Sequence, residues 1–428
     1  MRADIINLGC SKNLVDSEKL MTQLRAQGVQ SCIDPIRVDA DVLIINTCGF
    51  ILDARQESID TILAAVELRK QDRVKRIIVM GCLVQRYADD LRTEIPEIDA
   101  WFGVDQVDHL LSYLDLHYNP EILNQRRIST PKHYAFLKVS EGCSRKCAFC
   151  SIPSIRGKHV SRPVEEILSE AAFLAASGVR EILLIAQDLS YYGRELYHES
   201  MLVPLLEKMS GIEGLKWIRL HYTYPEKFPE GLIGMMGSEP KICRYLDMPF
   251  QHISDKMLKR MKRGYTRADT LKIVEDIRKG VPGVHIRTSL IVGHPGETEK
   301  EYAELLNFVR ESRFERLGVF KYSQEDGTFA RDHYKDDVPE AVKQDRYDEI
   351  METQRTISGQ INRNKVGQRM EILIDRKEGE FYVGRSEFDS PEVDQEILVS
   401  SRRRTLKTGV FYPAEIVKSD EYDLYAVI

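Results

Sequence analysis

Three cysteines lie within ten residues of one another, at Cys143, Cys147 and Cys150 of the segment "EGCSRKCAFC", in a C-x3-C-x2-C pattern. A structural zinc ion is usually closed by four Cys or His ligands, and the residues that follow offer only His159. A [4Fe-4S] cluster also normally takes four cysteines. Three thiolates would therefore leave one iron open for a substrate or cofactor. The pattern favours such a cluster, with a zinc site as the alternative.

The segment before these cysteines predicts where they lie in the fold. Residues 133–143, "HYAFLKVSEGC", read as a buried strand, so the cysteines follow its carboxyl end, where α/β folds build their sites. Strand-like and helix-like segments then alternate, which predicts a partial (βα) barrel. The expected strands are residues 180–188, 215–225, 244–252, 285–298 and 316–328, and the expected helices are residues 164–178, 266–280 and a segment from 299.

A second set of three cysteines lies in the first hundred residues. Cys10, Cys48 and Cys82 each end an apolar, strand-like run, and helical segments separate the runs. The order β-α-β-α-β predicts a parallel sheet with all three cysteines at one edge, where they would form a second cluster with an open iron. The alternative is three buried thiols that only pack, which is our interpretation of Cys32 and Cys243.

The composition of the chain restricts where in the cell the protein can work and what it can bind. The chain has 61 Lys and Arg against 67 Asp and Glu, so no global positive field attracts nucleic acid. No apolar run approaches the roughly 18 residues of a membrane span, and the N-terminus lacks the features of a signal peptide. We expect a cytoplasmic protein with no membrane partner, in which cysteines serve as ligands, catalytic groups or core residues rather than disulfides.

The cysteine triplet, with Phe149 just before Cys150, resembles the C-x3-C-x-Φ-C motif of the radical S-adenosylmethionine (SAM) enzymes. The resemblance implies that the open iron chelates the amino and carboxylate groups of SAM. An electron from the cluster then cleaves the sulfonium and gives a 5′-deoxyadenosyl radical. Residues 291–297, "IVGHPGE", match the family's loop near the SAM adenine and include Gly293.

Four polar residues near expected strand ends are candidates to hold SAM or substrate, although each is as readily a cap or a salt-bridge partner. They are Gln187, Arg219, Gln251 and Arg287.

The "LGC…NTC…GC" pattern before this triplet resembles the methylthiotransferases. That resemblance implies two [4Fe-4S] clusters, with SAM used both as methyl donor and as radical source. It also implies an N-terminal parallel α/β domain (1–118), a partial radical-SAM barrel (130–360) and a small C-terminal β-barrel of the TRAM type (364–428). Alternating strand-like runs from about residue 366 fit the last domain, and residues 338–365, with Pro339 near the first turn, read as one connecting helix.

The family has one branch that modifies an adenosine in tRNA and another that modifies the β-carbon of an aspartate in ribosomal protein S-twelve. Residues 366–428 hold nine Lys and Arg against thirteen Asp and Glu, which is the wrong sign for a tRNA clamp and suits a basic ribosomal protein. The segment 389–394, "DSPEVD", also resembles the ribosomal-protein branch. Arg402–Arg404 could touch phosphate, or could be a solvated turn.

We therefore predict an S-twelve aspartate methylthiotransferase that acts on the free protein or on the small ribosomal subunit. It would need a sulfur donor and an electron donor such as flavodoxin or ferredoxin. The alternatives are a tRNA adenosine methylthiotransferase and a non-catalytic metal-binding protein associated with RNA or ribosomes.

Overall fold

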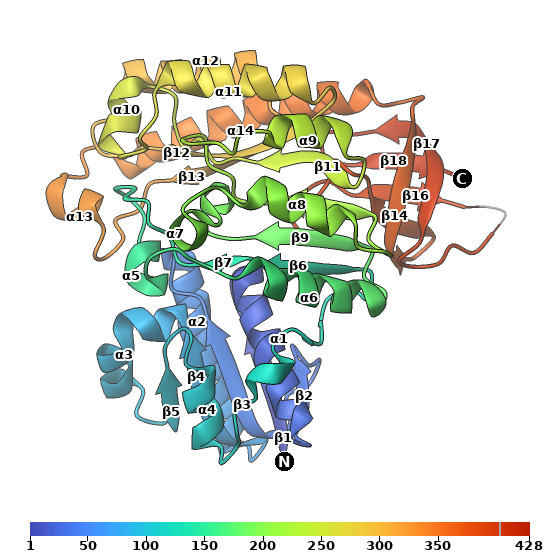
Figure 1. Ribbon diagram of the computed structural model, residues 1–428. Helices are drawn as coiled ribbons and strands as arrows, with labels where there is room; N and C mark the ends of the chain where they lie inside the picture. Colours follow the sequence, from blue (N-terminus) through green and yellow to red (C-terminus); the bar gives the residue numbers. More distant parts are fainter. Residues whose placement is uncertain (402–403) are drawn as a thin grey trace.

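Three β-structures organise the computed structural model, which describes residues 1–401 and 404–428 (Figure 1). In Figure 1 an N-terminal sheet lies below, a central sheet with its helices lies above, and a C-terminal barrel lies to one side. Arg402 and Arg403, two residues of the basic triplet, lie outside the described residues. No helix in the described part of the chain is both long and apolar enough to cross a membrane.

The N-terminal sheet has five parallel strands in the order β2-β1-β3-β4-β5. Its three central strands are those expected from the sequence, and β3 is buried along almost its whole length, as in parallel sheets covered on both faces. The strands are β1 (Arg2–Asn7), β2 (Gln30–Ile33), β3 (Ala40–Thr47), β4 (Val74–Gly81) and β5 (Ala100–Phe102). Helices cover them: α1 (Ser11–Ala26), α2 (Leu52–Lys70), α3 (Cys82–Glu94) and α4 (Val107–Tyr113), with a 3-10 turn η1 (Pro120–Ile122) after them.

The central sheet has six parallel strands in the order β13-β12-β11-β10-β9-β6, so neighbours in sequence are neighbours in space. It is open between β6 and β13, which confirms a partial barrel. All six strands were expected from the sequence. They are β6 (Tyr134–Lys138), β9 (Glu181–Ile185), β10 (Trp217–Leu220), β11 (Ile242–Asp247), β12 (His285–Val292) and β13 (Arg316–Lys321).

Helices cover the outside of this sheet and bury one continuous apolar core against it. Two of them begin with capping boxes, α11 at Thr266 and α12 at Thr298, which fixes where the preceding loops end. The helices are α5 (Ile152–Arg156), α6 (Val164–Ala176), α7 (Arg194–Tyr197), α8 (Leu202–Ser210), α9 (Leu232–Ser238), α10 (Asp255–Arg260), α11 (Arg267–Gly280), α12 (Glu299–Ser312) and α13 (Phe329–His333), with a 3-10 turn η2 (Leu189–Tyr191).

One long helix, α14 (Glu340–Arg363), leads from the central sheet to the C-terminal barrel, as the sequence predicts, and Pro339 is its N-cap. The barrel is closed in the order β14-β15-β16-β18-β17. Its strands are β14 (Arg369–Glu378), β15 (Phe381–Arg385), β16 (Ile397–Ser400), β17 (Phe411–Ser419) and β18 (Leu424–Val427).

The barrel packs against the amino ends of the central strands. Trp217, the first residue of β10, stacks edge-on against Phe411, with ring centroids 4.7 Å apart. Arg316, the first residue of β13, forms a buried ion pair with Asp389 at 2.6 Å. His133, just before β6, lies 2.7 Å from Asp375. The carboxyl ends of the central strands are therefore on the side away from this seam.

Two acidic residues counted in the C-terminal barrel are consequently not surface charges. Asp389 is completely buried against Arg316, and the side chain of Asp394 is 1% exposed beside Arg287. The "DSPEVD" segment that contains both residues therefore lies in the seam, the interface between the central sheet and the C-terminal barrel. The interpretation of the acidic excess as a docking face for a basic protein is therefore wrong for these two carboxylates.

Candidate active site

The loop with the cysteine triplet is held by a short antiparallel ribbon of β7 (Ser140–Glu141) and β8 (Val160–Ser161). Within it, the backbone N–H of Cys143 donates to the carbonyl of Gly157 at 3.1 Å. Gly142 has φ +69°, and a Cβ at this position would lie 2.1 Å from the carbonyl oxygen of Lys158. Only glycine fits at this position, so Gly142 determines the path of the backbone into the loop.

The three thiols of this loop influence one another. The pKa of Cys143 is raised to about 11 and that of Cys150 to about 12; burial is the largest cause, and the charge of Cys147 contributes to both shifts. Buried thiolates need a compensating cation. Iron of a cluster supplies that charge, so the donor set fits a [4Fe-4S] group.

The structure also brings Cys10, Cys48 and Cys82 together at the carboxyl ends of β1, β3 and β4. The contact between their loops is close: a Cβ on Gly9 would lie 2.9 Å from the sulfur of Cys48, and one on Gly49 would meet the carbonyl of Cys82 at 2.8 Å. Burial raises the pKa of Cys82 to about 11, with further contributions from the charges of Cys10 and Cys48.

Neither set resembles a site for a single ion. Among the described residues, no three His, Cys, Asp or Glu side chains are close enough to share one metal. A zinc ion needs its donors around one point, whereas the cysteines of a cluster bind different irons at separate corners of a cube. Each set offers three cysteines, one fewer than the four ligands that a structural zinc site usually has.

Asn13 is a site residue that the sequence analysis missed. Its amide nitrogen donates to the carbonyls of Leu8 and Thr47, which precede two of the cysteines, at 2.8 and 3.0 Å. Its oxygen accepts a 2.5 Å hydrogen bond from Arg156 and lies 3.8 Å from the sulfur of Cys82. The only signal was its position three residues after Cys10.

Charged residues join the two cysteine-bearing regions. Asp16 of α1 pairs with Lys138 and, at 3.2 Å, with Arg156. Both cations also bind Glu141, at 2.5 and 3.0 Å. Burial alone would raise the pKa of Glu141, but the charges of Lys138 and Arg156 hold it well below its usual value. In the same region α1 contacts β6 and α3 contacts α5 (Figure 1), so the carboxyl edge of the N-terminal sheet faces the triplet loop.

Four of the other candidates lie at the carboxyl side of the central sheet. Gln187 donates to Glu141 at 3.1 Å. Phe149 packs in a small apolar cluster with Ile291, at the end of β12. Gly293 has φ +72°, and its N–H donates to Glu297 at 3.0 Å.

Gln251 has φ +71° and bridges to β12. The side-chain oxygens of both Gln187 and Gln251 are buried without a partner within the described chain. Orphaned buried acceptors of this kind fit a polar ligand.

Arg219 and Arg287 have a different environment. Arg219 is completely buried, donates to Glu181 at 2.7 Å and reaches the carbonyl of Glu387 in the barrel at 2.7 Å. Arg287 lies between Asp247 and Asp394, at 3.6 and 3.4 Å. Both guanidinium groups belong to the seam with the C-terminal barrel, which explains them as the salt-bridge partners weighed in the sequence analysis.

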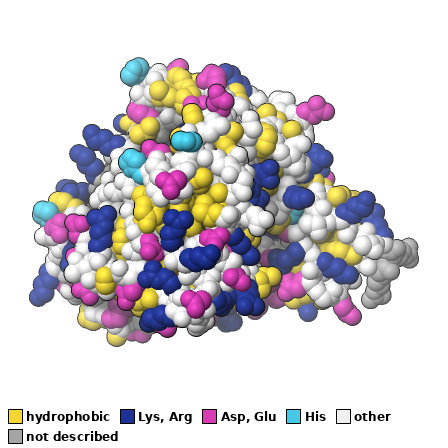
Figure 2. All heavy atoms as spheres, turned by 90° about the horizontal axis from the view of Figure 1, so that it is seen from below, with side chains coloured by type: hydrophobic (Ala, Val, Ile, Leu, Met, Phe, Trp, Pro, Cys, Tyr) yellow, Lys and Arg dark blue, Asp and Glu magenta, His cyan; other side chains and the backbone are white. Residues whose placement is uncertain are grey.

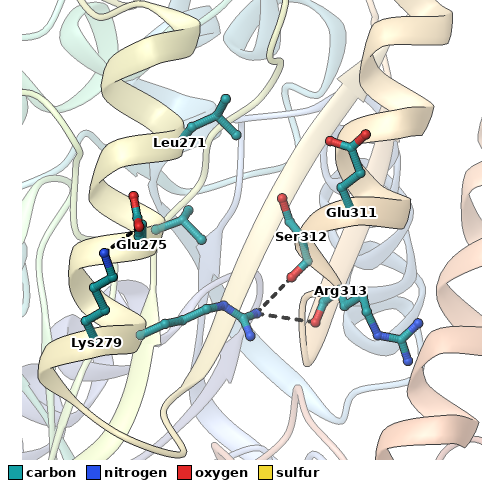
Figure 3. A pocket seen from close by; sticks show the side chains of 8 residues that line it. Leu271, Glu275, Lys279, Glu311, Ser312 and Arg313 are labelled. Carbon is teal, nitrogen blue, oxygen red and sulfur yellow. Dashed lines mark hydrogen bonds and ion pairs between the residues drawn. The ribbon is translucent and has the colours of Figure 1, made fainter.

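A hollow in the outer surface lies apart from these residues. It is between α11 and α12. Arg278 donates there to the carbonyls of Ser312 and Arg313, two residues that Figure 3 labels. No cysteine lines this hollow. Some of its charged groups pair with each other, as in the Glu275–Lys279 ion pair at 2.5 Å. It adds nothing to the candidate site.

Family models match three parts of the chain. Residues 2–103 match "Uncharacterized protein family UPF0004", residues 137–309 match the "Radical SAM superfamily", and residues 366–428 match the "TRAM domain".

Solved structures with low identity share the fold. The radical SAM methyltransferase TsrM from Kitasatospora setae aligns with a TM-score of 0.58 at 13% identity, over 77% of each chain. The cobalamin-dependent radical enzyme OxsB aligns with a TM-score of 0.53 at 12% identity, over 83% of this chain and 56% of that one.

Curated relatives match over the full length. A protein of Bacteroides thetaiotaomicron is 50% identical over 100% of this chain and 98% of its own, and one of Porphyromonas gingivalis is 50% identical over 100% and 99%. A third, from Christiangramia forsetii, is 49% identical over 99% and 93%. All three are named "Ribosomal protein uS12 methylthiotransferase RimO". The chain belongs to this RimO family of radical SAM methylthiotransferases.

Proposed function

We propose that this enzyme adds a methylthio group to the β-carbon of an aspartate in ribosomal protein uS12. The name shared by the full-length relatives supports the target. The observation that carries the chemistry is that Arg156, in the loop after the triplet, binds Asn13 and Asp16 beside the N-terminal cysteines, so that the carboxyl edges of the two parallel sheets lie against each other.

Each set would hold one [4Fe-4S] cluster: Cys10, Cys48 and Cys82 in the N-terminal domain, and Cys143, Cys147 and Cys150 in the central one. When bound, the clusters and SAM supply the methyl, sulfur and radical chemistry. The chain orients these groups. Asn13 ties the strand ends of Cys10 and Cys48 to Arg156, and Asp16 and Glu141 hold the two regions in register.

SAM would bind at the carboxyl side of the central sheet. The unpartnered oxygens of Gln187 and Gln251 are available to its amino group or ribose hydroxyls. Phe149 and the loop at Gly293 supply apolar surface and tightly turned backbone for the adenine.

Three further proposals follow from the family. The domains would span residues 1–118, 130–360 and 364–428, which the end of α14 at Arg363 supports for the last boundary. The enzyme would work in the cytoplasm, where ribosomal proteins are found. It would require a sulfur donor and a reductant such as flavodoxin or ferredoxin.

Surface charge supports a protein target over tRNA. Figure 2 shows basic and acidic side chains interspersed over the face of the N-terminal domain seen from below, and the chain as a whole has a net charge of -6. Binding dominated by phosphate contacts needs a continuous basic surface.

Mass spectrometry on two anaerobic reactions tests the proposal. Enzyme with reconstituted clusters, SAM and dithionite is mixed with uS12 in one reaction and with unmodified tRNA in the other. A methylthio gain on the uS12 aspartate alone supports the proposal, whereas gain on tRNA alone, or on neither, overturns it. Cys10→Ala should abolish the gain, because the second cluster would lose a ligand.

A further inference from the structure

One buried arginine next to the triplet has no carboxylate to balance it. Arg263 is 4% exposed, and its three guanidinium nitrogens each have one acceptor. Nε donates to the hydroxyl of Tyr265 at 3.0 Å, Nη2 to the carbonyl of Pro249 at 2.6 Å, and Nη1 to the sulfur of Cys147 at 3.1 Å. Within the described residues its charge meets no Asp or Glu within 4.0 Å.

A neighbouring arginine shows the contrast. Arg145 lies in the same loop as the cysteines, yet Asp188 pairs with it at 2.7 Å and Glu226 pairs with it as well. Both arginines lie over the ring of Tyr224, at 4.0 and 4.3 Å from its centroid. The positive charge of Arg145 is thus neutralised by the protein, whereas that of Arg263 is directed at a cysteine.

The position of Arg263 is fixed from several sides. The hydroxyl of Tyr224 donates to the carbonyl of Arg263 at 2.5 Å, and the hydroxyl of Tyr265 donates to the carbonyl of Phe250 at 2.7 Å. A buried guanidinium held this firmly without an acid requires an anion at the position it faces. The sulfur of Cys147 is the one group here that becomes anionic when it binds iron.

We propose that Arg263 sets the reduction potential of the cluster bound by Cys143, Cys147 and Cys150, by donating an N–H···S hydrogen bond to Cys147 and balancing the cluster's negative charge. This proposal rests on the proposed function, which places a cluster there. Hydrogen bonds to cluster sulfurs and nearby positive charge stabilise the reduced form, which has one more electron. Arg263 is a positioning residue, because it acts through Cys147.

The test is a redox titration followed by electron paramagnetic resonance. It uses the full chain with Cys10, Cys48 and Cys82 all changed to Ala, so that only one cluster remains. In this background Arg263→Gln should lower the ratio of reduced to oxidised cluster about tenfold at a fixed potential, a shift of about 59 mV to more negative values for one electron. Arg263→Lys keeps the charge and should shift the potential less.

Arg260→Gln is the matched control. Arg260 also lies over a tyrosine ring, 4.1 Å from the centroid of Tyr334, and donates to a carbonyl, that of Pro295, at 2.9 Å. It makes no hydrogen bond to a cysteine, so its replacement should leave the potential unchanged.

The outcomes separate this inference from the proposed function. If the background protein binds no four-iron cluster by iron and sulfide analysis, the proposed function fails first. If the cluster forms but Arg263→Gln and Arg263→Lys both keep the parent potential, Arg263 is only structural and the inference is overturned. Should Arg263→Gln fail to fold by circular dichroism, Arg263→Met, which also removes the charge and the N–H donor, decides: a negative shift supports the inference, and an unchanged potential refutes it.

Discussion

At the scale of single residues, the site depends on positions where only one side chain fits. Gly142 is such a position: its φ is +69°, and the carbonyls of Lys158 and Arg156 lie where a Cβ would be, at 2.1 and 2.7 Å. Gly142→Ala should displace the entry to the cysteine loop, because the obstructing atoms are backbone. We expect the loss of one of the two proposed clusters, measured as iron and sulfide per chain.

Gly327→Ala is the control for this prediction. Gly327 has the same φ of +69°, but no atom of the described residues lies within 4 Å of the added Cβ. Its replacement should cost only the left-handed backbone strain, about 1 kcal/mol of unfolding free energy, and leave the iron content intact. Equal iron loss in both variants would contradict the steric explanation.

Glu170 gives a prediction for acid stability. Burial would raise its pKa, but the charges of Arg126, Arg162 and Lys19 lower it to about 2. A carboxylate with a depressed pKa stabilises the fold above its unfolded pKa of about 4.5, and this contribution is lost as the pH falls towards 2. Its full size is on the order of 3 kcal/mol.

Glu170→Gln should therefore flatten the dependence of unfolding free energy on pH between about 5 and 2, measured by urea titration. Glu166→Gln, on the same helix and with a half-exposed side chain 3.8 Å from Arg162, should keep the steep profile of the parent. A parent-like slope in Glu170→Gln would rule out this linkage.

At the scale of elements, the sequence predicted the strands that are buried and missed those that are not. β1, β3 and β4 are long apolar runs, so their period and length identify them. The edge strands β2 and β5 have only four and three residues and neither is fully buried, so local sequence does not distinguish them from loops.

The direction in which a long side chain extends could not be predicted from the sequence either. Arg219 is the third of four residues of β10, close to its carboxyl end, yet its guanidinium extends back to Glu181, the first residue of β9. A long side chain can reach either end of a short strand. The cysteines were easier to place, because a short side chain that follows a strand must stay near the end of that strand.

The seam between the central sheet and the C-terminal barrel gives a prediction at this scale. Asp389→Ala would leave Arg316 buried without its ion pair, which typically costs about 3–5 kcal/mol. We expect a loss of this order in unfolding free energy. Glu380→Ala, at the exposed turn after β14, should be neutral to within about 0.5 kcal/mol. A neutral Asp389→Ala would mean that the barrel is not held by this pair.

At the scale of the whole molecule, the carboxyl edges of two parallel sheets lie against each other, and the barrel packs at the amino ends of the central strands. The barrel cannot then be a detachable RNA-binding tail, because Asp389 and Phe411 complete the packing of the central sheet. The other junction, at Asp16, Lys138 and Arg156, lies beside the cysteines. It is the place where domain packing and activity should be coupled.

Asp16→Asn tests that coupling. The variant keeps the six cysteines proposed as cluster ligands, so both proposed clusters should assemble, but Lys138 and Arg156 lose the carboxylate that ties them to α1. We expect about eight irons per chain, as in the parent, with faster cleavage of residues 114–130 in limited proteolysis and at least tenfold slower methylthiolation of uS12. Asp41→Asn removes an exposed pair with Lys75 at the amino end of the same sheet and should change neither rate. If Asp16→Asn modified uS12 at the parent rate, the register of the two cysteine sets would not depend on this junction.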